Sequence, residues 1–471
     1  MLRRLTSDRV LLRRVGYTAF VLCIFALAYF ALGTSKTRMA ATLIVVALPL
    51  LVYLSLFRPI IFPLSAYVLL VPFENLFATD KYGSISKLVA LFAAAVLTFW
   101  LIRTRRVVRP PGPALAAWGV FLLWMALSVF WALEPTDAVK YMVTCVELVA
   151  LFAIVSVTPA NRADLNGLLA AVVAGGTIAA AYGVYVFRNG SEVGGRLLIQ
   201  YGESKIDPNA FATALLLPIA LVVMAALNRR WSLQKLGFIA IVLVLMGGMF
   251  AAASRGALLG LGAMLVFFML RTRHRGQLLA VSIAGLLVSF LLPHSPWQRF
   301  SDALSHGGSG RLQIWLVGLH AFKEHWLLGA GAGMFQYAYD QSLIKVYQSV
   351  FAQWHKVAHN TPLSVLVELG TVGFVMFCVA WYRQWNIFKD TRANDGLRDL
   401  KVTLQAAMLG ITVSSIFLSV LTAKFLWLLF MVMAVVRSVS ISWDAQALLT
   451  PSSQLPEPGW PKGSVAVESV R

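Results

Sequence analysis

An all-α, polytopic membrane protein is the fold class that this sequence predicts, and two observations support it. Of the 471 residues, 59% are hydrophobic and 13% are charged, whereas soluble domains are about half apolar and about a quarter charged. The apolar residues also form blocks of roughly 18 to 22 residues, the length of a helix that crosses about 30 Å of hydrocarbon. We therefore expect a bundle of transmembrane helices.

Fourteen apolar spans are predicted, or twelve if two short ones do not cross the membrane. Spans 59–73 and 256–270 are the short ones, and they could be tilted, broken or partly re-entrant. Glycines within the spans suit close helix packing: Gly175, Gly176, Gly247, Gly248, Gly260 and Gly262. The predicted spans are 15–33, 39–57, 59–73, 85–102, 114–133, 138–157, 165–187, 209–227, 236–253, 256–270, 277–292, 361–382, 402–420 and 425–441.

The net charge of +20 follows from membrane topology rather than from nucleic-acid binding, so we expect no nucleic-acid partner. Basic clusters such as "RTRRVVR", "RRWSLQK" and "RTRHR" fall in alternate loops, as they do on the cytoplasmic side of membrane proteins. This pattern places both termini in the cytoplasm. Residues 1–445 form the expected transmembrane domain, and the tail 446–471, which is rich in Pro, Ser and Gly, is expected to be disordered.

Two loops on the opposite side exceed simple connections, namely 188–208 and 293–360. Loops of the second length are uncommon without a function. Within it, "GRLQIWLVGLHAFKEHW" predicts an amphipathic helix that could lie on the bilayer or cap the bundle. "LLGAGAGMF" predicts a glycine-rich turn, and "YAYDQSLIKVYQSVFAQWHK" a second short helix. The apolar face of the first helix comprises Leu312, Trp315, Leu316, Leu319, Phe322 and Trp326.

Four arginines are expected on this outer side: Arg196, Arg255, Arg299 and Arg311. A guanidinium group is permanently charged and binds phosphate with two parallel hydrogen bonds. Arg255 is the most informative, because it lies in a short hairpin between two apolar helices, where a charge needs a partner or water. Alternatively, Arg255 could have no ligand and extend its charged group to the water at the membrane surface. Arg196 and Arg311 could be ordinary solvated charges, and Arg299 is expected to be a surface residue.

His359 and Asn360 precede a long apolar span. Asn360 or Thr361 is a natural N-cap and Pro362 suits the first turn, so helix capping explains "NTP". Capping does not explain His359, which could be a general base if burial and nearby guanidinium groups keep its imidazole neutral. No HExxH or comparable array is present, so we predict neither a metal site nor a cofactor.

The order of these motifs resembles the O-antigen ligase and O-antigen polymerase superfamily. The likeness lies in "SRG" at 254–256, "GRLQIW" at 310–315, "LLGAGAGMF" and "HNTPLSVLVELGTVGF" from residue 359. It implies a GT-C-like enzyme of the bacterial inner membrane. Such an enzyme moves a glycan from undecaprenyl pyrophosphate to an acceptor on the periplasmic face without a metal ion.

The resemblance also implies roles for particular residues. Arg255 and Arg311 would hold the donor pyrophosphate and act in catalysis, and His359 would be the catalytic base. Arg196 matches by position only. The acceptor would be a lipid A-core sugar for a ligase, or another glycan for an O-antigen or exopolysaccharide polymerase. The fourteen spans predicted for this chain exceed the twelve that are usual for ligases of this superfamily.

Three alternatives stay open at the level of sequence. A protein O-glycosylase shares the donor chemistry and differs in its acceptor. A flippase or transporter for lipid-linked oligosaccharides would need polar residues within its helices, which are scarce here. A peptidoglycan-type polymerase would depend on a loop carboxylate such as Asp302 or Asp340.

Overall fold

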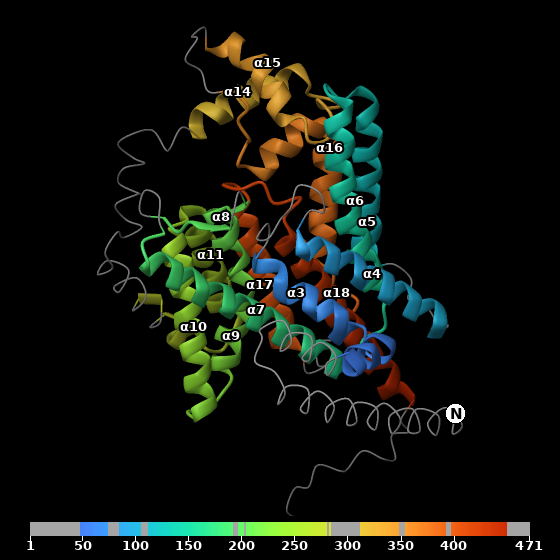
Figure 1. The fold of residues 1–471 in the computed structure, drawn as a ribbon, viewed down its shortest axis with the longest axis vertical. Helices are drawn as coiled ribbons and strands as arrows, with labels where there is room; N and C mark the ends of the chain where they lie inside the picture. Colours follow the sequence, from blue (N-terminus) through green and yellow to red (C-terminus); the bar gives the residue numbers. More distant parts are fainter. Residues whose placement is uncertain are drawn as a thin grey trace, which may run out of the picture.

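The computed structural model describes residues 48–73, 84–104, 112–191, 196–201, 204–279, 282–283, 311–347, 354–391 and 397–449, and helices dominate it (Figure 1). The single sheet in this part of the chain is an antiparallel hairpin of β1 and β2, in which Ile199 pairs with Ile206. The elements are η1 (Ile60–Leu64), α3 (Ser65–Leu70), η2 (Val71–Phe73), α4 (Ile85–Thr104), α5 (Pro113–Leu127), η3 (Ser128–Trp131), α6 (Pro135–Val157), α7 (Arg162–Arg188), β1 (Ile199–Tyr201), β2 (Ser204–Ile206), α8 (Pro208–Ala214), α9 (Leu216–Leu227), α10 (Leu233–Ala252), α11 (Arg255–Arg271), α14 (Arg311–Glu324), α15 (Phe335–Val346), α16 (Thr361–Trp385), α17 (Arg398–Ser414) and α18 (Lys424–Leu449).

Eight helical segments of the described residues are long and apolar enough to cross a membrane. A ninth candidate is the pair Leu48–Phe57 and Ile60–Phe73, which is bent by 115°; the bend falls between the predicted spans 39–57 and 59–73, which would then count as one span. The polytopic all-α fold is thus confirmed, with eight or nine candidate spans among the described residues and fourteen predicted for the whole chain. Span 15–33 and most of 277–292 lie outside the described residues. In addition, α11 and α17 have only 17 residues each.

The basic loops and the region around Arg255 lie at opposite ends of the same helices. Helix α10 ends at Ala252, and α11 returns from Arg255 to Arg271, so the two ends are about 25 Å apart. At the far end, Asn228 donates a hydrogen bond from Nδ2 to Asp399 Oδ2 at 2.9 Å. The basic loops after α9 and α11 therefore lie at one end of these helices, and the turn before Arg255 lies at the other.

Glycines allow several helices to approach closely, as predicted. A Cβ on Gly175 would lie 2.5 Å from the carbonyl oxygen of Leu69, and one on Gly260 would lie 2.4 Å from that of Gly410. Close approaches also involve Gly176 and Gly248, at 2.6 and 2.8 Å, whereas a Cβ on Gly247 would lie 3.2 Å from a methyl group of Val184. The prediction is wrong for Gly262, where an added Cβ would meet open space.

Helices α14 and α15 pack together above the ends of α8 and α11 and beside α16 (Figure 1). Both were predicted, and the side of α14 that is buried differs from its predicted apolar face. The buried residues are Val317, Gly318 and Ala321, whereas the leucines of the predicted face are exposed, namely Leu312, Leu316 and Leu319. Hydrophobic spacing alone could not reveal that a face of small residues makes the contact with α15 and α16.

The glycine-rich turn between α14 and α15 is held against a break in α16. Gly370 has φ +66° within α16, and the preceding Glu368 accepts a hydrogen bond from Gly333 N at 2.9 Å through its carboxylate. Its carbonyl oxygen accepts another from Gly331 N at 2.8 Å. These bonds fix α14 and α15 relative to the first half of α16, the segment that His359 precedes.

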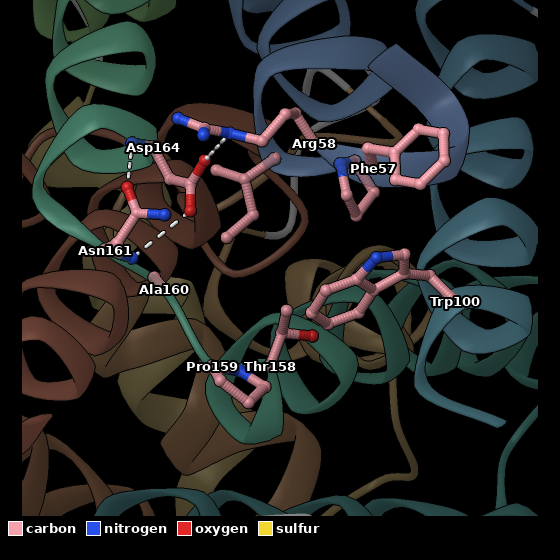
Figure 2. Close-up of a pocket in the computed structure, with 10 residues that line it drawn as sticks. Phe57, Arg58, Trp100, Thr158, Pro159, Ala160, Asn161 and Asp164 are labelled. Carbon is pink, nitrogen blue, oxygen red and sulfur yellow. Dashed lines mark hydrogen bonds and ion pairs between the residues drawn. The ribbon is translucent and has the colours of Figure 1, made fainter. Parts of the chain in front are cut away.

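An ion pair joins the N-terminal end of α7 to the bent segment before η1. Arg58 Nε donates to Asp164 Oδ1 at 3.0 Å, and Asp164 also accepts from the backbone of Asn161 (Figure 2). The pair lines a cavity of about 340 Å³, with Phe57 and Trp100 on its apolar side. Because each charge meets its opposite, we interpret this cavity as a structural joint.

Candidate active site

The connection between α17 and α18, residues 415–423, forms the floor of the candidate site. Thr361 is buried and donates its backbone N–H to Ser415 O at 2.8 Å and its hydroxyl to Leu418 O at 2.7 Å. The same hydroxyl oxygen accepts from Val420 N at 3.0 Å. The start of α16 is therefore fixed on this floor by three hydrogen bonds.

His359 precedes that fixed start and has an unusual backbone conformation. Asn360 is the N-cap, because its Oδ1 accepts from Leu363 N at 2.9 Å, and Pro362 lies in the first turn. His359 itself has φ +44° and is half-buried. Left-handed backbone is uncommon for residues other than glycine and is concentrated at functional sites. Capping therefore accounts for "NTP" and does not account for the conformation of His359.

Helix α14 contributes two residues one turn apart, so both project from the same face. Arg311 is its first residue. Trp315 donates from Nε1 to Ala358 O at 3.0 Å, and its ring lies 6.2 Å from that of Phe417 on the floor. The "GRLQIW" motif thus links Arg311 to the segment that carries His359.

Arg255 begins α11 after a sharp turn. Ala253 ends α10 with φ +47°, and Ser254 caps α11 by accepting from Ala257 N at 3.4 Å. Gly256 lies against Phe417, where a Cβ would be 2.9 Å from Phe417 Cβ. A larger residue at position 256 would push the turn that carries Arg255 away from the floor.

Asn209 connects this turn to Arg196. Its Oδ1 accepts from an Arg196 terminal nitrogen at 2.8 Å and from Ser254 Oγ at 3.0 Å. Arg196 also donates from Nε to Ala252 O at 3.3 Å. On the other side, Asn209 Nδ2 donates to Asp207 Oδ1 at 3.1 Å. The Asn209 amide therefore joins Arg196, Asp207 and Ser254, the residue that precedes Arg255.

The charges of this region act on one another. Burial and the neighbouring Arg255 lower the pKa of Arg311, while Asp207 opposes the shift. Burial and Arg311 lower the pKa of His359, which favours its neutral form, and Asp207 again opposes. Arg311 thus lies within electrostatic reach of Arg255 and His359, and Asp207 lies within reach of both Arg311 and His359. The group combines guanidinium charges, suited to phosphate, with an imidazole that can accept a proton.

The other candidate residues do not join this group. Arg299 and Asp302 lie outside the described residues. Asp340 accepts from the backbone of His355 at 2.8 Å and pairs with its Nδ1 at 2.6 Å, so it fixes a neighbouring turn. Among the described residues, no group of three or more His, Cys, Asp or Glu side chains could hold a metal ion.

Two residues of the site, Asp207 and Asn209, were missed at the level of sequence. The "DPN" at 207–209 has the form of an ordinary helix start, and Asp207 does cap α8 by accepting from Asn209 N at 2.9 Å. The sequence signal that could have identified them is that one loop region contains Arg196 together with Asp207 and Asn209.

Residues 239–378 match the model of a protein family described as O-antigen ligase. This finding confirms the resemblance seen in the motifs. Arg255, Arg311 and His359 fall inside the matched region, and Arg196 and Asp207 precede it. None of the curated proteins matches the chain.

Proposed function

We propose, from the O-antigen ligase domain at residues 239–378, that this multi-pass membrane protein is a glycosyltransferase. Its reaction would move a glycan from undecaprenyl pyrophosphate to a lipid A-core sugar hydroxyl on the periplasmic face of the bacterial inner membrane. The observation that supports the proposal is that the segments bearing Arg255, Arg311 and the half-buried His359 all contact residues 415–423 at one end of the bundle.

The arginines act on the donor in this mechanism. Arg255 and Arg311, with Arg196 beside them, bind the pyrophosphate and neutralise the charge that develops on it as its bond to the sugar breaks. Burial and, after it, repulsion by Arg255 lower the pKa of Arg311, and this repulsion favours binding of an anion between the two arginines. The arginines rather than a metal ion provide the positive charge.

His359 acts on the acceptor. Its neutral imidazole removes the proton of the acceptor hydroxyl as the oxygen attacks the anomeric carbon from the face opposite the pyrophosphate. The new glycosidic bond forms as undecaprenyl pyrophosphate leaves, so the anomeric configuration inverts. The role of His359 is favoured over one for Asp340, because Asp340 is bound to His355.

A deletion strain tests the assignment through its surface glycans. A ligase predicts unmodified lipid A core together with polymer that is still attached to undecaprenyl pyrophosphate. Single repeat units on the core would instead identify a polymerase of the same superfamily. Unchanged surface glycan and unchanged lipid-linked glycan would contradict both, and retention of donor on the cytoplasmic face would indicate a flippase.

A further inference from the structure

A second charged cavity lies at the end of the bundle opposite the candidate active site. It has a volume of about 260 Å³ and lies between the ends of α9 and α11 and the start of α17. The polar residues that line it are Asn228, Arg271, Thr272, Arg273, His274, Arg398 and Asp399.

The lining carries an excess of positive charge. Three arginines face one acid, Asp399, which leaves an excess of two positive charges when histidine is neutral. Asp399 accepts from Asn228 at 2.9 Å, and within the described part of the chain none of these arginines forms a salt bridge. In the cavity of Figure 2, by contrast, Arg58 is neutralised by Asp164.

Two neutral polar side chains of the lining, those of Asn228 and Thr272, differ in their hydrogen bonding. Asn228 bridges two elements, since its Nδ2 donates to Asp399 and its Oδ1 lies 3.2 Å from His274 Nε2. The Thr272 hydroxyl is shielded from solvent and has no hydrogen-bond partner among the described residues. A ligand oxygen in the cavity would satisfy that donor and meet the three guanidinium groups.

We propose that this cavity binds the phosphate of an anionic phospholipid. Guanidinium groups bind phosphate oxygens with paired hydrogen bonds. The cavity lies where the apolar segment Pro208–Leu227 ends, which is the level of the lipid headgroups, and basic pockets between helices bind such headgroups. Zwitterionic lipids fit less well, because their own cation opposes the excess positive charge. The proposal is independent of the glycan-transfer reaction.

Thermal unfolding of the purified full-length chain in detergent tests the proposal. Phosphatidylglycerol is expected to raise the unfolding temperature, and phosphatidylethanolamine or inorganic phosphate at equal concentration is not. Equal stabilisation by inorganic phosphate would overturn the assignment to a lipid. Equal stabilisation by phosphatidylethanolamine would overturn the assignment to an anionic headgroup.

A charge-matched pair of variants locates the site. Replacing Arg271, Arg273 and Arg398 by glutamine should weaken the apparent affinity for phosphatidylglycerol by about tenfold or more, because charged hydrogen bonds are lost. The control variant replaces Arg229, Arg230 and Arg275 by glutamine and should keep the wild-type affinity. These arginines are exposed at the same end of the bundle and do not line the cavity. An equal change in phosphatidylglycerol affinity in the two triple variants would overturn the assignment of the lipid to this cavity.

A conservative single variant covers the case in which the triple variant does not fold. Arg398→Lys keeps the charge and loses the planar fork, so phosphatidylglycerol binding should weaken while the unfolding temperature without lipid stays unchanged. Native mass spectrometry would count the bound phosphatidylglycerol. Retention of the wild-type number and affinity in Arg398→Lys would contradict the role of the fork.

Discussion

The guanidinium group of Arg196 donates a hydrogen bond to Asn209 Oδ1 at 2.8 Å. The same oxygen accepts from Ser254, the residue before Arg255. Two segments that are distant in sequence, each with one arginine, are therefore joined through one side-chain oxygen. In the proposed mechanism, this oxygen sets the separation of two groups that bind the donor pyrophosphate.

Asn209→Ala should weaken donor binding, because Arg196 and Ser254 both lose their acceptor. A hydrogen bond to a charged group contributes about 1.5–3 kcal/mol, so the donor KM should rise about tenfold or more while acceptor KM changes little. Asn209→Asp keeps an acceptor oxygen and should recover much of the donor affinity. Steady-state kinetics with purified lipid-linked donor would measure both. Equal changes in the donor and acceptor KM of Asn209→Ala would argue for a general folding defect.

Arg255→Lys should reduce transfer although the charge is kept. Lysine cannot form two parallel hydrogen bonds to one phosphate, so we expect a loss of about tenfold in kcat/KM for the donor. Arg188→Lys, at the exposed end of α7, is a matched control and should transfer at the wild-type rate. Wild-type activity of Arg255→Lys would contradict paired binding of phosphate by Arg255.

The pH dependence of transfer should report the charges around His359. Its pKa is lowered by burial and by Arg311, so the rate should fall with acidification only below the ordinary histidine pKa of about 6.5. Asp207→Asn removes a carboxylate that raises this pKa, so the acid limb should move to lower pH. Lys356→Gln removes a cation that lowers it, so the limb should move to higher pH. Acid limbs that coincide in all three proteins would contradict the assignment of this limb to His359.

The turn that fixes α14 against α16 should tolerate no side chain at Gly329. A Cβ there would lie 2.3 Å from Glu368 O, whereas at Gly190, which has the same φ of +81°, it would meet open space. Both alanine variants adopt a left-handed conformation at a cost of about 1–2 kcal/mol, but only Gly329→Ala adds a steric clash. Thermal unfolding should therefore show a larger loss of stability for Gly329→Ala than for Gly190→Ala. Equal losses of stability in the two variants would contradict a tight contact between the glycine-rich turn and α16.

Local features of the sequence predicted much of the fold. Apolar blocks predicted the long helices, and the helix start was predicted at Asn360 or Thr361; the structure places it at Asn360, which caps Leu363 three residues away. The number of spans was less predictable. Span 402–420, for example, ends as a helix at Ser414, because the following residues form the floor of the candidate site.

The remaining features depend on contacts between distant residues. Asp207 influences Arg311 and His359, which are more than a hundred residues away in sequence. On α14, apolar spacing could not show that Leu312 and Leu316 are exposed while Gly318 is buried. The local role of Asp207 as the cap of α8 already explained that residue, so the sequence offered no reason to expect its electrostatic influence on Arg311 and His359.

The most direct test of the central claim is the transfer rate of His359→Gln with purified lipid-linked donor and acceptor. Glutamine keeps hydrogen-bonding groups and cannot act as the base. General-base catalysis typically contributes about 10²- to 10⁴-fold, so the rate should fall at least about a hundredfold while the donor still binds with nearly unchanged affinity. Transfer by His359→Gln at the wild-type rate would contradict the role of His359 and, with it, the proposed mechanism.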